Sequence, residues 1–106
     1  MAEIEKAVAK IYDEFKDFDE INENTLVVVC TNAMLLIEQY FKTESGGFKE
    51  RVCLALMAKL IKERIKDRDV QMALLNFNRT VMPTMISRIC AMSKEGFKKF
   101  ETTCCG

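Results

Sequence analysis

Cysteine is the residue of this chain best suited to chemistry, because the sequence contains five cysteines and no histidine. Without histidine, Ser-His-Asp triads, histidine acid–base catalysis and zinc sites with histidine ligands are excluded. Cys30, Cys53 and Cys90 lie within apolar runs, whereas Cys104 and Cys105 are adjacent to each other. An odd number of cysteines, three of them in apolar runs, favours buried thiols in a reducing compartment over a disulfide framework.

The adjacent cysteines Cys104 and Cys105 allow two further interpretations. As metal ligands they lack the spacing at which paired cysteines reach one tetrahedral ion, and we expect neither a metal site nor a cofactor. As lipidation sites they do not fit the CaaX form, but reversible acylation beside Lys98 and Lys99 would hold this end of the chain at a membrane surface. An exposed tail with two unmodified thiols is the simpler interpretation.

Two other patterns are better explained by structure than by ligand binding. Gly46 and Gly47 lack the following Gly-Lys-Ser/Thr of a phosphate-binding loop and are typical of a turn between helices. The lysines of residues 59–66 alternate with Glu63, as on a solvated helix face. The net charge is zero, so the global basic excess of a nucleic-acid-coating protein is missing. Because no residue set has the form of an active site, we expect a non-enzymatic protein without a small-molecule substrate.

The elements that position these residues are predicted from a polar rhythm in the apolar stretch of residues 26–41. Its polar pairs recur at a spacing of seven residues, which is close to two helical turns, so they align in one narrow stripe. We therefore expect a central buried helix over about residues 25–43. The side chains expected to be inaccessible are Val28, Met34, Leu35 and Ile37, and those expected to be more exposed are Asn32 and Gln39.

Periodic apolar residues predict further helices around this one. Residues 3–18 carry an apolar residue at every third or fourth position, which is the seam of an amphipathic helix. A helix from Phe48 to about Lys66 forms an antiparallel hairpin with the central helix at Gly46 and Gly47. Pro83 predicts a break near residues 80–83, between a fourth helix and a final one. The sequence thus predicts an all-α fold, a compact bundle of four to five helices over residues 1–98, with a tail of residues 99–106.

Charge is distributed unevenly along the chain. Residues 1–24 contain eight acids and three bases, a net of −5, whereas residues 42–68 contain eight bases and four acids, a net of +4. Opposite charges attract, so we expect the first helix to pack near the third. The groups expected to face each other are Glu3, Asp13 and Asp17 on one side and Lys59, Lys62 and Arg64 on the other.

The sequence also bears on location. The N-terminal residues are acidic and amphipathic, whereas a signal peptide begins with a basic and then an apolar region. Residues 26–37 are too short, and too interrupted by Thr31 and Asn32, to span a bilayer. We expect an intracellular, cytoplasmic or virion protein that is not secreted.

Three short motifs occur in a familiar order: MLLIE at residues 34–38, the Gly47, Lys49, Glu50 and Val52 pattern, and the Pro83, Ile86, Ile89, Ser93 and Lys94 pattern. Over residues 25–98 the chain resembles small all-helical proteins encoded by large cytoplasmic DNA viruses. The motifs consist mostly of apolar spacing with one glycine and one proline. The resemblance implies a viral protein that is part of a particle, and it implies no catalytic residue.

The expected function is interaction with other proteins. The final helical segment carries Met82, Met85, Met92 and Phe97, more large apolar residues than one inward face requires, so a protein partner or self-association is expected to cover some of them. We predict a helical structural protein, a minor component of a virus particle or another large assembly. The alternative is a membrane-surface adaptor held by acylated Cys104 or Cys105.

Overall fold

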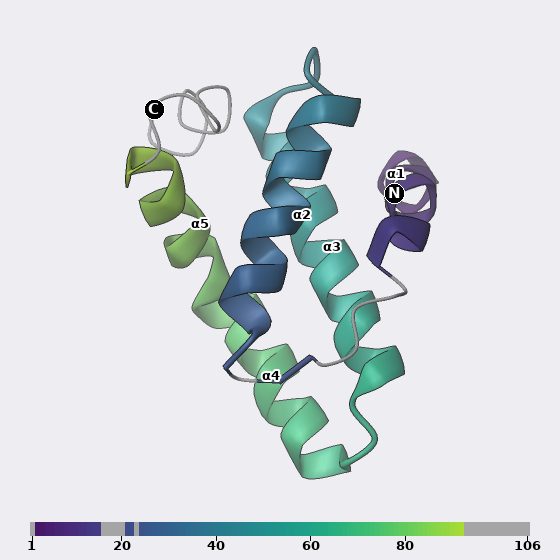
Figure 1. The fold of residues 1–106 in the computed structure, drawn as a ribbon, viewed down its shortest axis with the longest axis vertical. Coiled ribbons are helices and arrows are strands. Elements are labelled where there is room, and N and C mark those ends of the chain that lie inside the picture. The colour runs from purple at the N-terminus through teal and green to yellow at the C-terminus, as the bar shows by residue number, and fades with distance from the viewer. Residues whose placement is uncertain (1, 16–20, 23, 93–106) are drawn as a thin grey trace.

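Helices account for all regular secondary structure in the described part of the chain. The computed structural model describes residues 2–15, 21–22 and 24–92, and these residues contain no β-strand. The helices are α1 (Ala2–Tyr12), the short 3-10 helix η1 (Asp13–Phe15), α2 (Leu26–Tyr40), α3 (Gly46–Arg64), α4 (Arg68–Thr80) and α5 (Met82–Met92). The predicted all-α bundle is confirmed (Figure 1).

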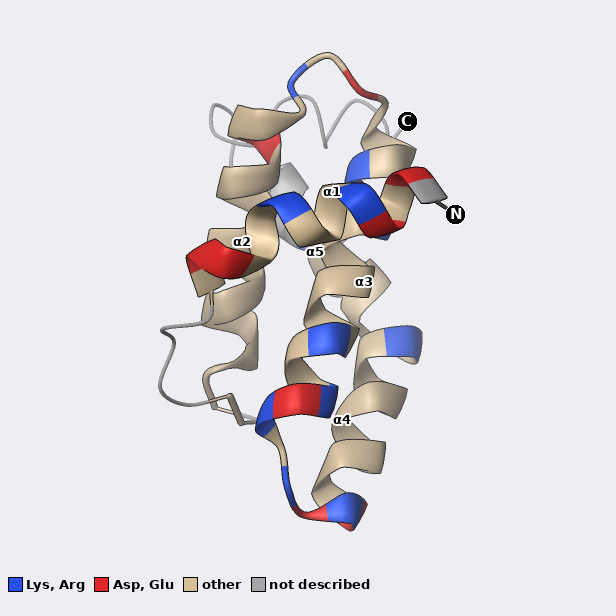
Figure 2. Cartoon of the chain, turned by 90° about the vertical axis from the view of Figure 1, so that its right-hand side faces the viewer, with Lys and Arg blue, Asp and Glu red and all other residues tan. Residues whose placement is uncertain are grey.

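The helices are arranged around α3. This helix packs against α1, α2, α4 and α5. It forms an antiparallel hairpin with α2, and α1 runs crosswise over one side of that hairpin (Figures 1 and 2). The central place that we predicted for residues 25–43 therefore belongs to α3, while α2 is a core helix that is covered along one side.

The burial of α2 follows from this position. Its buried side chains lie on the side that faces the core, and they are Leu26, Val29, Cys30, Ala33, Met34 and Ile37. Met34 and Ile37 are buried and Asn32 and Gln39 are exposed, as predicted. The prediction that Val28 and Leu35 are buried is wrong, because they are 58% and 44% exposed. An apolar composition all around a helix does not decide how many neighbours the helix has.

The turn of the hairpin comprises residues 41–45 and lies just before the two glycines. The Ser45 hydroxyl accepts a hydrogen bond from the Phe48 N–H at 3.1 Å and caps α3. Gly46 and Gly47 are the first residues of the helix, and none of the described glycines has a positive φ. Because Ser45 caps the helix, α3 begins at Gly46. The prediction that Gly46 and Gly47 form the turn before a helix starting at Phe48 is therefore wrong: the hairpin is present, but its turn precedes the glycines.

Short capping interactions also end α3 and begin α4. The Asp67 carboxylate accepts from the Val70 N–H at 3.1 Å. The Gln71 side-chain amide donates to the carbonyls of Lys62 and Ile65, both at 3.1 Å, so it satisfies acceptors that the end of α3 leaves open. These bonds fix the reversal between the two helices.

The predicted break at Pro83 is confirmed. Helix α4 ends at Thr80 and α5 begins at Met82, with the single residue Val81 between them. The Val81 N–H still donates to the Phe77 carbonyl at 2.8 Å. Pro83 lies in the first turn of α5, where its missing N–H has no helical partner to lose.

Candidate partner-binding surface on helix α2

The outward side of α2 carries a line of exposed, uncharged residues. They recur at steps of four, three and four, which places them on one face of the helix. We call this line the α2 stripe; it consists of Val28, Asn32, Leu35 and Gln39. Two of its four members are large apolar side chains at a spacing of seven residues. Such a seam is the pattern by which one helix packs along another.

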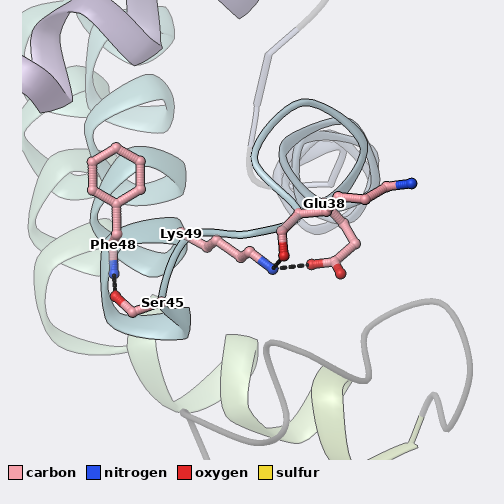
Figure 3. A network of polar contacts seen from close by, with 5 residues as sticks. Glu38, Ser45, Phe48 and Lys49 are labelled. Carbon is pink, nitrogen blue, oxygen red and sulfur yellow. Dashed lines mark hydrogen bonds and ion pairs between the residues drawn. The ribbon is translucent and has the colours of Figure 1, made fainter.

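The stripe owes its lack of charge to the composition of α2. Charged residues make up 30% of the chain, yet α2 contains one, Glu38. The ribbon of α2 is accordingly uncharged but for one acidic position, in contrast to α1 (Figure 2). The negative charge of Glu38 is compensated within the fold, because its carboxylate binds the buried ammonium of Lys49 (Figure 3). Depletion of charge is what distinguishes the centre of protein interfaces from other surfaces.

The contact between Lys49 and Glu38 holds α2 in register with α3. Lys49 Nζ lies 2.6 Å from Glu38 Oε1 and 3.5 Å from the carbonyl oxygen of Lys42 in the turn. The side chain of Lys49 is fully buried, while that of Glu38 is 20% exposed. One ammonium thus ties the end of α2, the turn and the start of α3 together, which presents the α2 stripe on a fixed support.

Helix α1 packs against α3, as predicted from the charge distribution. Of the groups named in that prediction, Arg64 takes part, but its partner is a backbone carbonyl of η1 and not an acidic side chain. The Tyr12 hydroxyl donates a hydrogen bond to the Glu63 carboxylate. The Arg64 guanidinium donates to the Phe15 carbonyl at 2.8 Å. Glu63 Oε2 also lies 3.8 Å from Lys59 Nζ, one turn earlier on the same helix. Within the described residues neither Glu3 nor Asp13 forms an ion pair with Lys59, Lys62 or Arg64, so that part of the prediction is wrong. Asp17 lies outside the described residues, and its ion pairing stays a prediction.

The hydrogen bond between Tyr12 and Glu63 changes the acidity of the phenol. The Glu63 carboxylate accepts the phenolic hydrogen, which raises the pKa of Tyr12 above its ordinary value. Burial and the negative charge of Glu63 raise the pKa further, while Arg64 lowers it. The contact between α1 and α3 is therefore sensitive to strongly alkaline conditions.

The methionines that we predicted to bind a partner lie differently. Met82 is fully buried in the core and cannot contact a partner in this fold. Met85 is partly buried against the same core. The side chain of Met92 and all of Phe97 lie outside the described residues. Among the methionine side chains that the structure describes, Met72 of α4 has a large exposed surface, at 58%.

Met72 lines a shallow groove between α3 and α4. The groove has a volume of about 370 Å³, and Ala58 and Leu75 are among the residues that line it. Lys62 and Arg79 stand at the same groove. The groove thus combines cationic and apolar side chains.

Two of the cysteines meet in the core. Cys30 of α2 and Cys53 of α3 are fully buried, and their Sγ atoms are 3.6 Å apart. The sequence predicted that both thiols are buried but not that they meet, because Cys30 lies eleven residues before the turn of residues 41–45 and Cys53 eight residues after it. Cys104 and Cys105 lie outside the described residues. In the part of the chain that the structure describes, no group of three or more Cys, Asp or Glu side chains is placed to hold a metal ion.

Comparisons with known proteins return no relative. No protein-family model, curated protein or solved structure matches the chain significantly. None of the helices within the described ranges has both the length and the apolar character needed to cross a membrane.

Proposed function

We propose that this chain is a non-enzymatic helical interaction protein that binds a helix of a protein partner along the α2 stripe. The observation that carries the proposal is the exposure of Val28 and Leu35 on one face of a helix whose single charged residue is used internally. A partner helix with apolar residues at matching steps would cover both side chains.

The energetics suit a specific but moderate contact. Complete burial of a Val or Leu side chain contributes about 1.5–3 kcal/mol, and these two are already about half covered. Two such side chains alone would not sustain tight binding against the entropy lost on association. The amides of Asn32 and Gln39 lie in the same line. A polar residue in a helical seam favours one register over others, so they supply specificity.

The test places a charge on the stripe. Leu35→Asp is expected to leave the fold intact, because the side chain is exposed, and to abolish association. The matched control is Val70→Asp, which makes the same kind of change at a 38% exposed position on α4. The self-association of both variants and of the unchanged chain is measured by sedimentation at micromolar concentration, and their retention of proteins from the native source is compared by quantitative mass spectrometry. Equal behaviour of the two variants in both measurements would contradict the proposal.

We further propose that the assembly is a virus particle, of which the chain is a minor component. This part is supported by the sequence resemblance over residues 25–98. Mass spectrometry of particles purified from the native source is expected to detect the chain at a fixed ratio to the major particle protein. A chain carrying Leu35→Asp is expected to be depleted from them. Absence of the unchanged chain from purified particles would overturn this part and leave the interaction through the α2 stripe to be judged on its own test.

A further inference from the structure

The two buried cysteines of the hairpin are in direct contact. Cys30 projects from α2 and Cys53 from α3, and a distance of 3.6 Å between sulfur atoms leaves no room for another atom between them. Both side chains are fully buried, and neither cysteine is in a disulfide. A cysteine that merely fills space needs only apolar neighbours, whereas these two meet each other across the interface of two helices.

We propose that Cys30 and Cys53 form a redox-active pair, in which a peroxide converts the two thiols to a disulfide that joins α2 to α3. The sulfurs of a disulfide lie about 2.05 Å apart, so the pair must close by roughly 1.5 Å. Side-chain rotation and a small shift of α2 supply a movement of this size. Helix α2 is suited to it because it is covered along one side only.

The chemistry is balanced with one peroxide for each pair. One cysteine, as thiolate, attacks a peroxide oxygen; the O–O bond breaks, hydroxide leaves and takes up a proton, and a sulfenic acid forms. The second sulfur then attacks the oxidised sulfur, the S–O bond breaks and a second water leaves. Two electrons pass from the two sulfurs to the peroxide, and the products are one disulfide and two waters. Because closing of the hairpin returns the second thiol to contact with the first, the sulfenic acid meets its partner when α2 packs on α3 again.

Burial determines when this reaction takes place. An oxidant reaches the sulfurs only when α2 separates locally from α3, so the rate of oxidation reports that opening. Once formed, the disulfide prevents the same opening and restricts the unfolded chain, which stabilises the hairpin. The α2 stripe would then be presented by a helix that can no longer leave α3. The pair does not depend on the proposed function, since it is defined by the core alone.

The experiment keeps the pair and removes the other thiols. A chain carrying Cys90→Ser, Cys104→Ser and Cys105→Ser is reduced, folded, treated with hydrogen peroxide, quenched with catalase, and then alkylated with N-ethylmaleimide in denaturant. We expect an intact mass lower by two hydrogens and no alkylation. After trypsin without reductant, a linked species of peptides 17–42 and 52–59 is expected, because these contain Cys30 and Cys53. Dithiothreitol should restore two alkylatable thiols.

Two controls make the result decisive. Adding Cys53→Ala to this chain is expected to abolish the linked peptides, and the oxidised parent chain should unfold at a higher temperature than its reduced form. If Cys53→Ala does not fold, recovery of both thiols by dithiothreitol in the parent chain still tests the bond. Full alkylation after peroxide, a link only between two chains, or a link that forms only in denaturant would each overturn the proposal.

Discussion

The ammonium of Lys49 lies 2.6 Å from the carboxylate of Glu38, and the two side chains differ in their access to water. Lys49 is fully buried at the start of α3, whereas Glu38, near the end of α2, retains 20% of its exposure. The lysine therefore depends on the glutamate for its solvation far more than the glutamate depends on the lysine. Removing Glu38 should therefore change the stability by a different amount than removing Lys49.

We expect Glu38→Ala to be the more damaging change. It leaves a buried ammonium with the Lys42 carbonyl at 3.5 Å in place of a carboxylate, and the loss of one partner of a buried pair costs about 3–5 kcal/mol. Lys49→Met fills a similar volume without a charge and leaves Glu38 in contact with water, so its cost should be about 1 kcal/mol or less. Urea denaturation of the two variants measures both values. A larger loss of stability for Lys49→Met than for Glu38→Ala would mean that the ion pair stabilises the fold by more than the cost of removing its two charges from water.

The difference in exposure between two leucines gives a second prediction. Leu56 of α3 is fully buried, whereas Leu35 is 44% exposed. Leu56→Ala should lower the free energy of unfolding by about 2–5 kcal/mol, since it removes buried methylenes and leaves a cavity. Leu35→Ala should cost less than about 1 kcal/mol, because its side chain has water on one side. Both changes are Leu to Ala within a helix, so the intrinsic helix propensity cancels in the comparison. Similar losses in chemical denaturation would place Leu35 in the core after all.

The sequence predicted the helices well because their signals are local. Apolar periodicity and the helix break at Pro83 each act within a few residues. It did not predict which helix is central, because that depends on how many neighbours a face has. The better signal was the width of the apolar surface of α3, where Val52, Cys53, Leu56, Met57, Leu60 and Ile61 are all buried. A wide apolar surface demands several neighbours, and α3 has them.

The candidate surface was missed for the same reason. Val28 is exposed and Val29 is buried, although they are adjacent valines in one apolar run, and the position of α3 decides which of them is covered. Met82 was predicted to bind a partner because its segment carries more large apolar residues than one inward face requires, yet it is buried in the core of the bundle. The contact of Cys30 with Cys53 required the three-dimensional register of the hairpin, which follows from the turn of residues 41–45 and from the Lys49–Glu38 pair.

Asn78 supplies a third prediction, because its buried amide is satisfied on one side only. Its Nδ2 donates to the Leu54 carbonyl at 3.1 Å, while within residues 2–15, 21–22 and 24–92 no donor reaches its Oδ1. Asn78→Leu removes this acceptor, and the change in unfolding free energy should be within about 1 kcal/mol of zero or stabilising. Asn78→Asp places a carboxylate in the same place and should destabilise by about 3 kcal/mol at neutral pH.

The pH dependence of stability tests the prediction for Asn78→Asp. Protonation neutralises the introduced carboxylate, so the penalty of Asn78→Asp should shrink as the pH falls, whereas that of Asn78→Leu should not change. Denaturant titrations at neutral and acidic pH measure both. A strongly destabilised Asn78→Leu would show that the bond to Leu54 outweighs the cost of the unpaired oxygen.

The last prediction concerns the phenol of Tyr12 and has a defined sign. The hydrogen bond to Glu63 raises the pKa of Tyr12 in the folded state, while the unfolded chain has the ordinary value of about 10. The folded state thus holds the proton more tightly. Its contribution to stability is fully present below about pH 10 and is lost as the pH rises through the folded-state pKa. Tyr12→Phe should remove this dependence and flatten the stability over the same range.

The titration of the Tyr12 phenol can be followed without a signal from another tyrosine or from tryptophan. The chain has two tyrosines and no tryptophan, so Tyr40→Phe leaves Tyr12 as the single phenol. Its ionisation, followed by the ultraviolet absorbance of tyrosinate, should have a midpoint above about 10 in the folded chain. Adding Glu63→Gln removes the charge and weakens the acceptor, so the midpoint should fall toward the ordinary value. An unmoved midpoint in that variant would show that burial, and not the carboxylate of Glu63, governs the acidity of Tyr12.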